Sequence, residues 1–454
     1  MSKTRITRRD FLYIIGGGIA GWLARDFFIM AENKRELNSI SKGANGEMLV
    51  NGEAFFPLGV YYLVGQTNNP DTTMSYLFRT KINMVYAYNH QELTTLDMLD
   101  RLSEISIREG RSIFAFAGNR NETFRDTAHA LELLPLIETH PSMLCWYIDE
   151  PVRGLTWNQE RTQVVPEQYE PTDLQLFIAR NSRLPSFTVF NRSGFLDTSQ
   201  GLELAVNFLS DTNNLLVGSD TYVSDITEQN RFYLSLARNV NLFTNLIKED
   251  RLPSQFNIAV LSAISDSVLP GGIQIPSDYR HRMGEAITAI INGANGILWW
   301  DYPPGCDQQG CGTGENQWEG GYGGGNNAYS CYWQDIVDIT DKLAQVEDAL
   351  LGRTIVAHDY SFSQGQETVE YLIKETESRY VAFVVNTADI LLRGGIALKD
   401  VNGKILDTRE YAYDLDGKAY SIANGRINLQ LESGESLILT IEKPSFLSGF
   451  LDLF

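Results

Sequence analysis

Residues 143–151 read Met-Leu-Cys-Trp-Tyr-Ile-Asp-Glu-Pro, an apolar run that ends in two acids and a proline. A short apolar run with such an abrupt end predicts a strand that is covered on both faces, as in a parallel sheet. In α/β folds of this kind, the polar residues at the carboxyl ends of the strands face the ligand. The stretch therefore predicts a buried strand that delivers Asp149 and Glu150 to a binding site.

Similar runs recur along the chain, and each is followed by a longer helical pattern. The predicted strands are residues 55–61, 82–88, 112–117, 143–148, 186–190, 215–220, 257–261 and 296–300. Strands that alternate with helices are typical of βα units and a parallel sheet. Eight units within about 300 residues favour a (β/α)8 TIM barrel over residues 48–350. An open, doubly wound sheet is the alternative α/β fold.

Two of the intervening helices carry clear signals. Thr94 and Asp97 form a predicted capping pair before a stripe of apolar residues, and Gly110 is the predicted stop. A second stripe, within residues 283–291, repeats at helical spacing and ends at Gly293. Such stripes are expected to pack in the core.

The pattern changes at about Leu351. Short strand candidates follow one another without helices at residues 354–357, 368–373, 380–385, 395–398, 404–406 and 437–441. Four turn signals lie between or beside them, at Asn402-Gly403, Asp416-Gly417, Asn424-Gly425 and Ser433-Gly434. The pattern predicts a small antiparallel β-sandwich over residues 351–445, with residues 446–454 as a tail. Its expected role is to pack against the barrel, with carbohydrate binding as a second role.

Residues 1–31 have the pattern of a targeting segment. Four basic residues within the first nine precede the apolar stretch Phe11–Ala24, which is too short to span a membrane as a helix. Residues 7–12, Thr-Arg-Arg-Asp-Phe-Leu, resemble the bacterial twin-arginine export motif. That resemblance implies the twin-arginine translocation machinery as a partner and an extracytoplasmic location, periplasmic or secreted. Residues 1–31 are then a signal or an uncleaved membrane anchor, and residues 32–47 a linker.

A competing motif occupies the same place. Gly16–Gly21 reads G-x-G-x-x-G, as in a dinucleotide site. Such a site also needs an acidic residue at the end of a second strand, and the corresponding stretch from Glu32 to Ser41 is polar and reads as a linker. The twin arginines explain the glycines more simply, so no cofactor is expected.

Charge and cysteine content exclude other classes of protein. Lys and Arg total 37 against 57 Asp and Glu, giving a net charge of −20, which disfavours nucleic-acid binding. Four cysteines are too few for a disulfide framework, and neither H-E-x-x-H nor paired C-x-x-C predicts a metal site. Cys306, Cys311 and Cys331 lie in or beside a glycine-rich loop after the eighth strand, where a disulfide would suit an exported protein. Cys145 is expected to be buried and reduced.

The ends of the predicted strands combine aromatic rings with carboxylates. Rings stack on the apolar faces of sugars, and glycoside hydrolysis needs one acid to protonate the leaving oxygen and a second anion on the opposite side. The predicted sugar-contacting residues are Tyr61, Tyr88, Asn89, Trp146, Tyr222, Trp300 and the loop residue Trp318. The predicted catalytic carboxylates are Glu150, Asp301, Asp220 and Asp149.

Three stretches resemble glycoside-hydrolase-like TIM barrels. Residues 51–61, Asn-Gly-Glu-Ala-Phe-Phe-Pro-Leu-Gly-Val-Tyr, look like the first barrel strand, and Trp146–Pro151 like the fourth. Residues 289–300 look like the last helix and eighth strand. The resemblance covers about residues 48–443 and implies that Glu150, before a proline, is the general acid/base of a glycosidase.

Two departures from the family pattern matter. Asp149 stands where the large retaining clan has Asn, and residues 260–264, at the end of the seventh strand, contain no nucleophilic Glu. The second carboxylate would then be Asp301, Asp220, Asp149 or Asp266, in which Asp301 and Asp220 rank first because both close well-defined strands. The leading hypothesis is an exported enzyme acting on a poly- or oligosaccharide. The rival is a non-catalytic carbohydrate-binding barrel that has lost its nucleophile.

Overall fold

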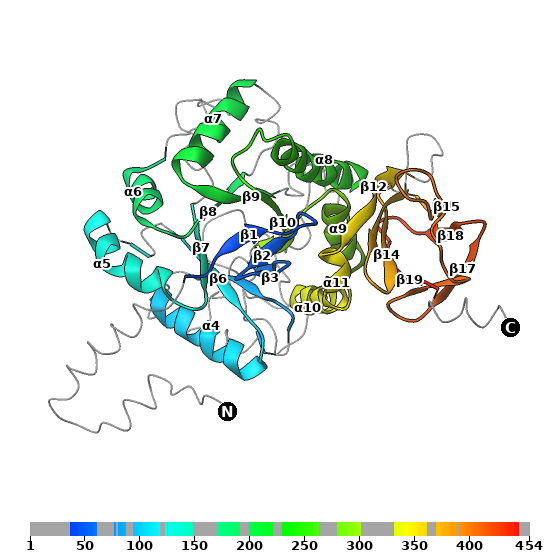
Figure 1. Cartoon of the computed structure of the whole chain (residues 1–454), viewed down its shortest axis with the longest axis horizontal. Coiled ribbons are helices and arrows are strands. Elements are labelled where there is room, and N and C mark those ends of the chain that lie inside the picture. The colour runs from blue at the N-terminus through cyan, green and yellow to red at the C-terminus, as the bar shows by residue number, and fades with distance from the viewer. Residues whose placement is uncertain are drawn as a thin grey trace, which may run out of the picture.

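The structure is a computed structural model, and it describes a barrel with a second β-rich unit beside it (Figure 1). The described residues are 37–60, 77–78, 80–87, 94–118, 123–124, 126–148, 171–190, 199–220, 229–262, 279–300, 331–360, 369–388 and 390–444. The twin-arginine motif, Gly16–Gly21 and the glycine-rich loop lie outside these residues.

Eight parallel strands close into a barrel in the order β10-β11-β4-β5-β6-β7-β8-β9. The strands are β4 (Leu58–Val60), β5 (Met84–Ala87), β6 (Phe114–Gly118), β7 (Met143–Tyr147), β8 (Ser186–Phe190), β9 (Asn214–Asp220), β10 (Phe256–Ser262) and β11 (Gly296–Trp300). All eight predicted strands are present, and the pairing of β11 with β4 closes the ring. The closed barrel is confirmed, and the open doubly wound sheet is excluded.

Helices follow the strands and cover the outside of the barrel. They are α4 (Thr95–Glu109), α5 (Thr127–Glu138), α6 (Asp173–Asn181), α7 (Ser199–Asp211), α8 (Gln229–Lys248), α9 (Tyr279–Ile291), α10 (Cys331–Ala344) and the short α11 (Glu347–Leu350). The predicted cap of α4 is present: Thr94 Oγ1 accepts a hydrogen bond from the Asp97 backbone N–H, and the Asp97 carboxylate accepts one from Thr94. Gly110 ends this helix at φ 66°, a left-handed conformation that glycine adopts without strain.

A three-stranded sheet closes the amino-terminal end of the barrel. It contains β1 (Ile40–Lys42), β2 (Met48–Val50) and β3 (Glu53–Ala54). Met48, Val50 and Phe55 share a core cluster with the first residues of two barrel strands, Phe114 and Phe256. Strand β1 lies within residues 32–47, which the sequence predicts as a linker, and its three residues are too few to form a periodic pattern.

The carboxyl-terminal unit is an antiparallel sheet of eight strands in the order β12-β13-β14-β19-β16-β17-β18-β15. Its strands are β12 (Arg353–Tyr360), β13 (Val369–Glu375), β14 (Arg379–Asn386), β15 (Leu392–Ala397), β16 (Tyr411–Asp414), β17 (Ala419–Ala423), β18 (Arg426–Leu431) and β19 (Ser436–Glu442). The sheet curls around one apolar core, to which both ends of the strand order contribute. The predicted β-rich unit is confirmed, and the glycines of all four predicted turns have positive φ.

Helix α9 joins the two units and lies between the barrel and the curled sheet (Figure 1). Every residue from His281 to Ile291 is buried, including the polar residues His281, Arg282 and Glu285 outside the apolar stripe. Val381 and Phe383 of β14 belong to the same core cluster as Ile287 and Ile290. The two units therefore share a continuous apolar interface.

Among the described helices, none combines the length and apolar character required to cross a membrane.

Candidate active site

Aromatic side chains pack together inside the barrel near the ends of the described strands. The ring centroids of Tyr86 and Tyr147 lie 5.3 Å apart in an edge-to-face arrangement, and Phe116 packs 5.1 Å from Tyr86. Such geometry suits the ring quadrupoles and fixes the ring positions. Both tyrosines are buried, so they form a rigid layer beneath the barrel mouth.

Gly118 keeps space for the Tyr86 hydroxyl. A Cβ atom at Gly118 would lie 1.9 Å from the Tyr86 Oη, far closer than two non-bonded atoms can approach. Because Gly118 is the last residue of β6, the Tyr86 hydroxyl lies at the level of the strand ends. Tyr86 is thus a candidate floor residue that the sequence analysis missed. The sequence could have indicated this residue, because Tyr86 stands two residues before the predicted site residue Tyr88. Residues two apart in a strand point to the same face.

The strand register places two predicted site residues at the same end of the barrel. Asp220 closes β9 and pairs with Val260, and Trp300 closes β11 and pairs with Ser262. Strand β10 lies between β9 and β11, so the backbones of Asp220 and Trp300 flank the end of β10. The described part of β10 ends at Ser262 without a carboxylate, as expected for the seventh barrel strand.

The fourth strand occupies the opposite side of the ring. β7 ends at Tyr147, three residues before Glu150 in the sequence. In the closed strand order β7 lies four positions from β11 in either direction, and two positions from β9. The ends of β7 and β11 therefore face each other across the barrel.

Most of the predicted site residues lie outside the described residues. These are Glu150, Asp149, Asp301, Tyr61, Tyr88, Asn89, Tyr222 and Trp318. The structure fixes the strand ends from which most of these residues follow in the sequence.

Trp146 occupies a packing position in place of the predicted sugar-contacting one. Its side chain is 0% exposed and lies in the layer between barrel and helices, where its ring centroid is 5.4 Å from that of Phe124. Its indole N–H donates to Ser182 Oγ at 2.7 Å. Successive residues of a strand point to opposite faces, so Trp146 faces outward while Tyr147 faces the barrel interior.

Cys145, predicted to be buried in the fourth strand, is fully buried in β7, and burial raises the pKa of its thiol. A thiol of this kind is protonated and unreactive at neutral pH. Within the described ranges, no three His, Cys, Asp or Glu side chains are grouped in a way that could hold a metal ion.

Solved structures of glycoside hydrolases share this architecture. A family 5 glycoside hydrolase from Bacteroides vulgatus superimposes with a TM-score of 0.56 at 14% identity, covering 89% of this chain and 93% of that chain. Another, described as a glycoside hydrolase, gives a TM-score of 0.55 at 15% identity over 90% and 97% of the two chains. No protein-family model and no curated protein sequence matches the chain. The chain therefore shares with these structures the fold of a TIM barrel followed by a carboxyl-terminal β-rich unit.

Proposed function

We propose that this protein acts on a poly- or oligosaccharide outside the cytoplasm, with Glu150 as general acid/base. One observation carries the proposal: the closed barrel has β7 as its fourth strand, and the residues Asp149-Glu150-Pro151 follow its end. The glycoside-hydrolase fold of the neighbouring structures supports the same reaction class. The acid would protonate the leaving oxygen of the glycosidic bond.

The second carboxylate is proposed to be Asp301, followed in order by Asp220 and Asp149. Asp301 comes directly after Trp300, at the end of the strand opposite β7, and Asp220 closes β9. Either acid could serve the opposite side of a sugar held above the tyrosine layer. A separation of about 5–5.5 Å from Glu150 would give retention of anomeric configuration, and about 6.5–9.5 Å inversion.

The remaining sugar contacts are proposed to come from Tyr61, Tyr88, Asn89, Tyr222, Trp300 and Trp318. Rings at the barrel mouth would stack on sugar faces and orient the scissile bond. The twin-arginine segment would deliver the folded protein across the membrane. Replacing both Arg8 and Arg9 by Lys should leave the protein in the cytoplasm, as measured by cell fractionation.

The test measures turnover of a broad panel of glycans, with the release of reducing ends as the readout. Glu150→Gln should lower the rate by about 10²–10⁴-fold, because general acid catalysis is lost. Glu132→Gln is the matched control, since Glu132 is an exposed acid on α5. Equal turnover by wild type and Glu150→Gln would refute the role of Glu150.

The second carboxylate is identified by Asp301→Asn, Asp220→Asn and Asp149→Asn in the same assay. Only the variant of the true partner should lose activity to the same order as Glu150→Gln. Proton NMR of the first anomer released then reports inversion or retention.

The second candidate is a non-catalytic carbohydrate-binding barrel. The absence of a carboxylate from the described end of β10 favours it, because this is where the retaining pattern places its nucleophile. Wild-type protein that binds glycans but releases no reducing ends across the panel would establish this function.

A further inference from the structure

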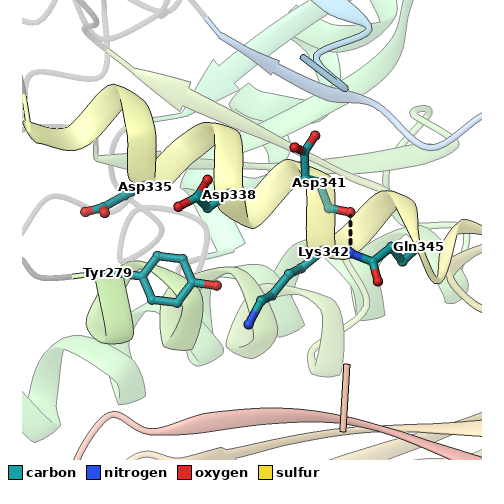
Figure 2. A pocket seen from close by; sticks show the side chains of 6 residues that line it. All are labelled: Tyr279, Asp335, Asp338, Asp341, Lys342 and Gln345. Atoms are coloured by element: carbon teal, nitrogen blue, oxygen red, sulfur yellow. Dashed lines mark hydrogen bonds between the residues drawn. The ribbon is translucent and has the colours of Figure 1, made fainter. Parts of the chain in front are cut away.

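A cavity of about 500 Å³ lies outside the barrel, beside α9 and α10 (Figure 2). Its lining residues come from the first residue of α9 and from α10 and the residue after it: Tyr279, Asp335, Asp338, Asp341, Lys342 and Gln345. Lys342 Nζ donates to Asp416 Oδ2 at 2.9 Å, and Asp416 lies in the turn between β16 and β17. The cavity therefore borders the carboxyl-terminal sheet.

Two exposed tyrosines lie on β16, on the strand that leads to Asp416. Tyr411 is 45% exposed and Tyr413 is 41% exposed, while Ala412 between them is buried in the core of the sheet. Their cross-strand partners on β17, Ser421 and Ala419, are small and exposed. No bulky partner on that strand covers the rings, which form what we call the tyrosine platform, Tyr411 and Tyr413.

The strand register shows which way the tyrosine platform faces. Tyr413 pairs with Thr440 of β19, and Thr440 pairs with Val381 of β14. Residues paired directly across strands have their side chains on the same face of the sheet. Val381 is 0% exposed and packs in the core cluster of the barrel and its helices. The platform thus lies on the barrel-facing side of the sheet, beyond the area that the helices cover.

Contacts between the sheet and the segment from Gln345 to α11 fix the position of α10 relative to the sheet. Arg379 of β14 donates to the Gln345 carbonyl oxygen at 3.2 Å and to Asp348 Oδ1 at 2.8 Å. Together with the Lys342–Asp416 ion pair, these bonds hold the carboxyl-terminal part of α10 against the same face of the sheet. The platform and the polar cavity therefore lie on the same side of the sheet.

We propose that this side of the sheet, with the tyrosine platform and the neighbouring cavity, is a second glycan-binding site, which holds a neutral polysaccharide by stacking on Tyr411 and Tyr413. Residues i and i+2 of a strand are about 6.8 Å apart, so the two rings present consecutive stacking surfaces along an extended chain. Asp338, Lys342 and Gln345 supply carboxylate, ammonium and amide groups for sugar hydroxyls. The inference takes its class of ligand, a polysaccharide, from the proposed function and therefore rests on it. The site itself lies outside the barrel.

The charges that line the cavity select against anionic ligands. Three of the lining residues are aspartates, and the lining lysine is already paired with Asp416. A phosphate backbone or an acidic polysaccharide would meet net repulsion at these aspartates. A polymer bound both here and at the barrel mouth would be held with higher overall affinity than at either site alone.

The experiment measures retardation of the protein in native gels that contain neutral polysaccharides, using Glu150→Gln to prevent hydrolysis. In this background, Tyr411→Ala/Tyr413→Ala should raise the dissociation constant by about tenfold or more, because both stacking surfaces are lost. Tyr411→Phe/Tyr413→Phe keeps both rings and should bind nearly as Glu150→Gln does. Val401→Ala removes an exposed apolar residue from another turn of the same unit and should change nothing. Thermal unfolding of each variant verifies folding.

Four results would overturn the inference. Equal retardation of the alanine and phenylalanine double variants would show that the rings do not contact the polymer. A dimer in light scattering that the alanine variant abolishes, without a change in glycan affinity, would make the platform a protein contact. Hydrolysis by the wild type without polysaccharide retardation would remove the second site and leave the proposed function intact. Failure of both hydrolysis and retardation would remove both.

Discussion

A buried acid at the interface between the two units, Glu285, should make the stability of the protein depend on pH. Glu285 lies on α9 and is 7% exposed, and its Oε2 has no hydrogen-bond partner among the described residues. Burial raises the pKa of this carboxyl from 4.5 to about 8, against the opposing effect of Arg282. The perturbation is Glu285→Gln, which keeps the shape and removes the titration.

The sign follows from proton binding in the two states. Between pH 4.5 and 8 the folded protein keeps the proton that the unfolded chain has lost, so raising the pH favours unfolding. Below pH 4.5 both states are protonated and the carboxyl has no effect. With these two pKa values, Glu285 lowers the free energy of unfolding by about 1 kcal/mol at pH 5 and by about 3 kcal/mol at pH 7.

The assay is urea unfolding of wild type and Glu285→Gln at pH 5, 7 and 9, followed by far-UV circular dichroism. The variant should be more stable than wild type at pH 7 and 9, and the difference should shrink towards pH 5. Glu132→Gln, at an exposed site on α5, should show no such trend. A constant difference across the pH range, or a variant less stable at pH 9, would refute the reasoning.

Three further predictions test the packing. Gly284→Ala places a Cβ 2.7 Å from the Gly434 carbonyl oxygen and 2.9 Å from Tyr233 Oη, so it should lower the free energy of unfolding by about 1–3 kcal/mol, measured by thermal denaturation. Trp146→Phe should cost about 1–3 kcal/mol through the lost bond to Ser182 and the space left, while glycan affinity stays unchanged; weaker binding without a loss of stability would contradict the packing position. Thr94→Ala removes the cap of α4 and should cost about 1 kcal/mol in urea unfolding, and no change would contradict the role of the cap.

Much of the barrel could be predicted because its strands are apolar throughout. Residues 186–190 and 296–300 match β8 and β11 without a shift, since both are bounded by turn or polar residues. The capping pair of α4 was equally readable, because a cap is a local interaction between residues three apart.

Strands that alternate apolar and exposed residues were missed. β16, β17 and β18 were not predicted, because in each of them exposed residues alternate with buried or half-buried ones and no apolar run forms. In contrast, the predicted strand at residues 404–406 is only a single bridge from Lys399 to Ile405. The pairing partners of these strands are distant in the sequence, and only the fold brings them together.

In the candidate site, too, the features set by local sequence were predicted and the features set by the whole fold were not. The sequence correctly predicted that the seventh strand ends without a carboxylate and that Asp220 and Trp300 close their strands. It misjudged Trp146, because residue type says nothing about which face of a strand a side chain takes. Whether Trp146 or Tyr147 faces the barrel interior depends on how the barrel closes, and that closure involves all eight strands together.

The position of the sheet β1–β3 also fixes the end of the barrel at which the described part of the chain begins. Asn38 Nδ2 donates to the carbonyl oxygens of Pro141 and Met143, at the beginning of β7, so the described chain enters at the amino-terminal end of the barrel. A tether attached ahead of Leu37 would therefore leave the barrel at the end opposite to the strand ends of β7, β9 and β11. Held to a surface by that tether, the protein would direct its barrel mouth away from the surface, towards polymers arriving from the medium.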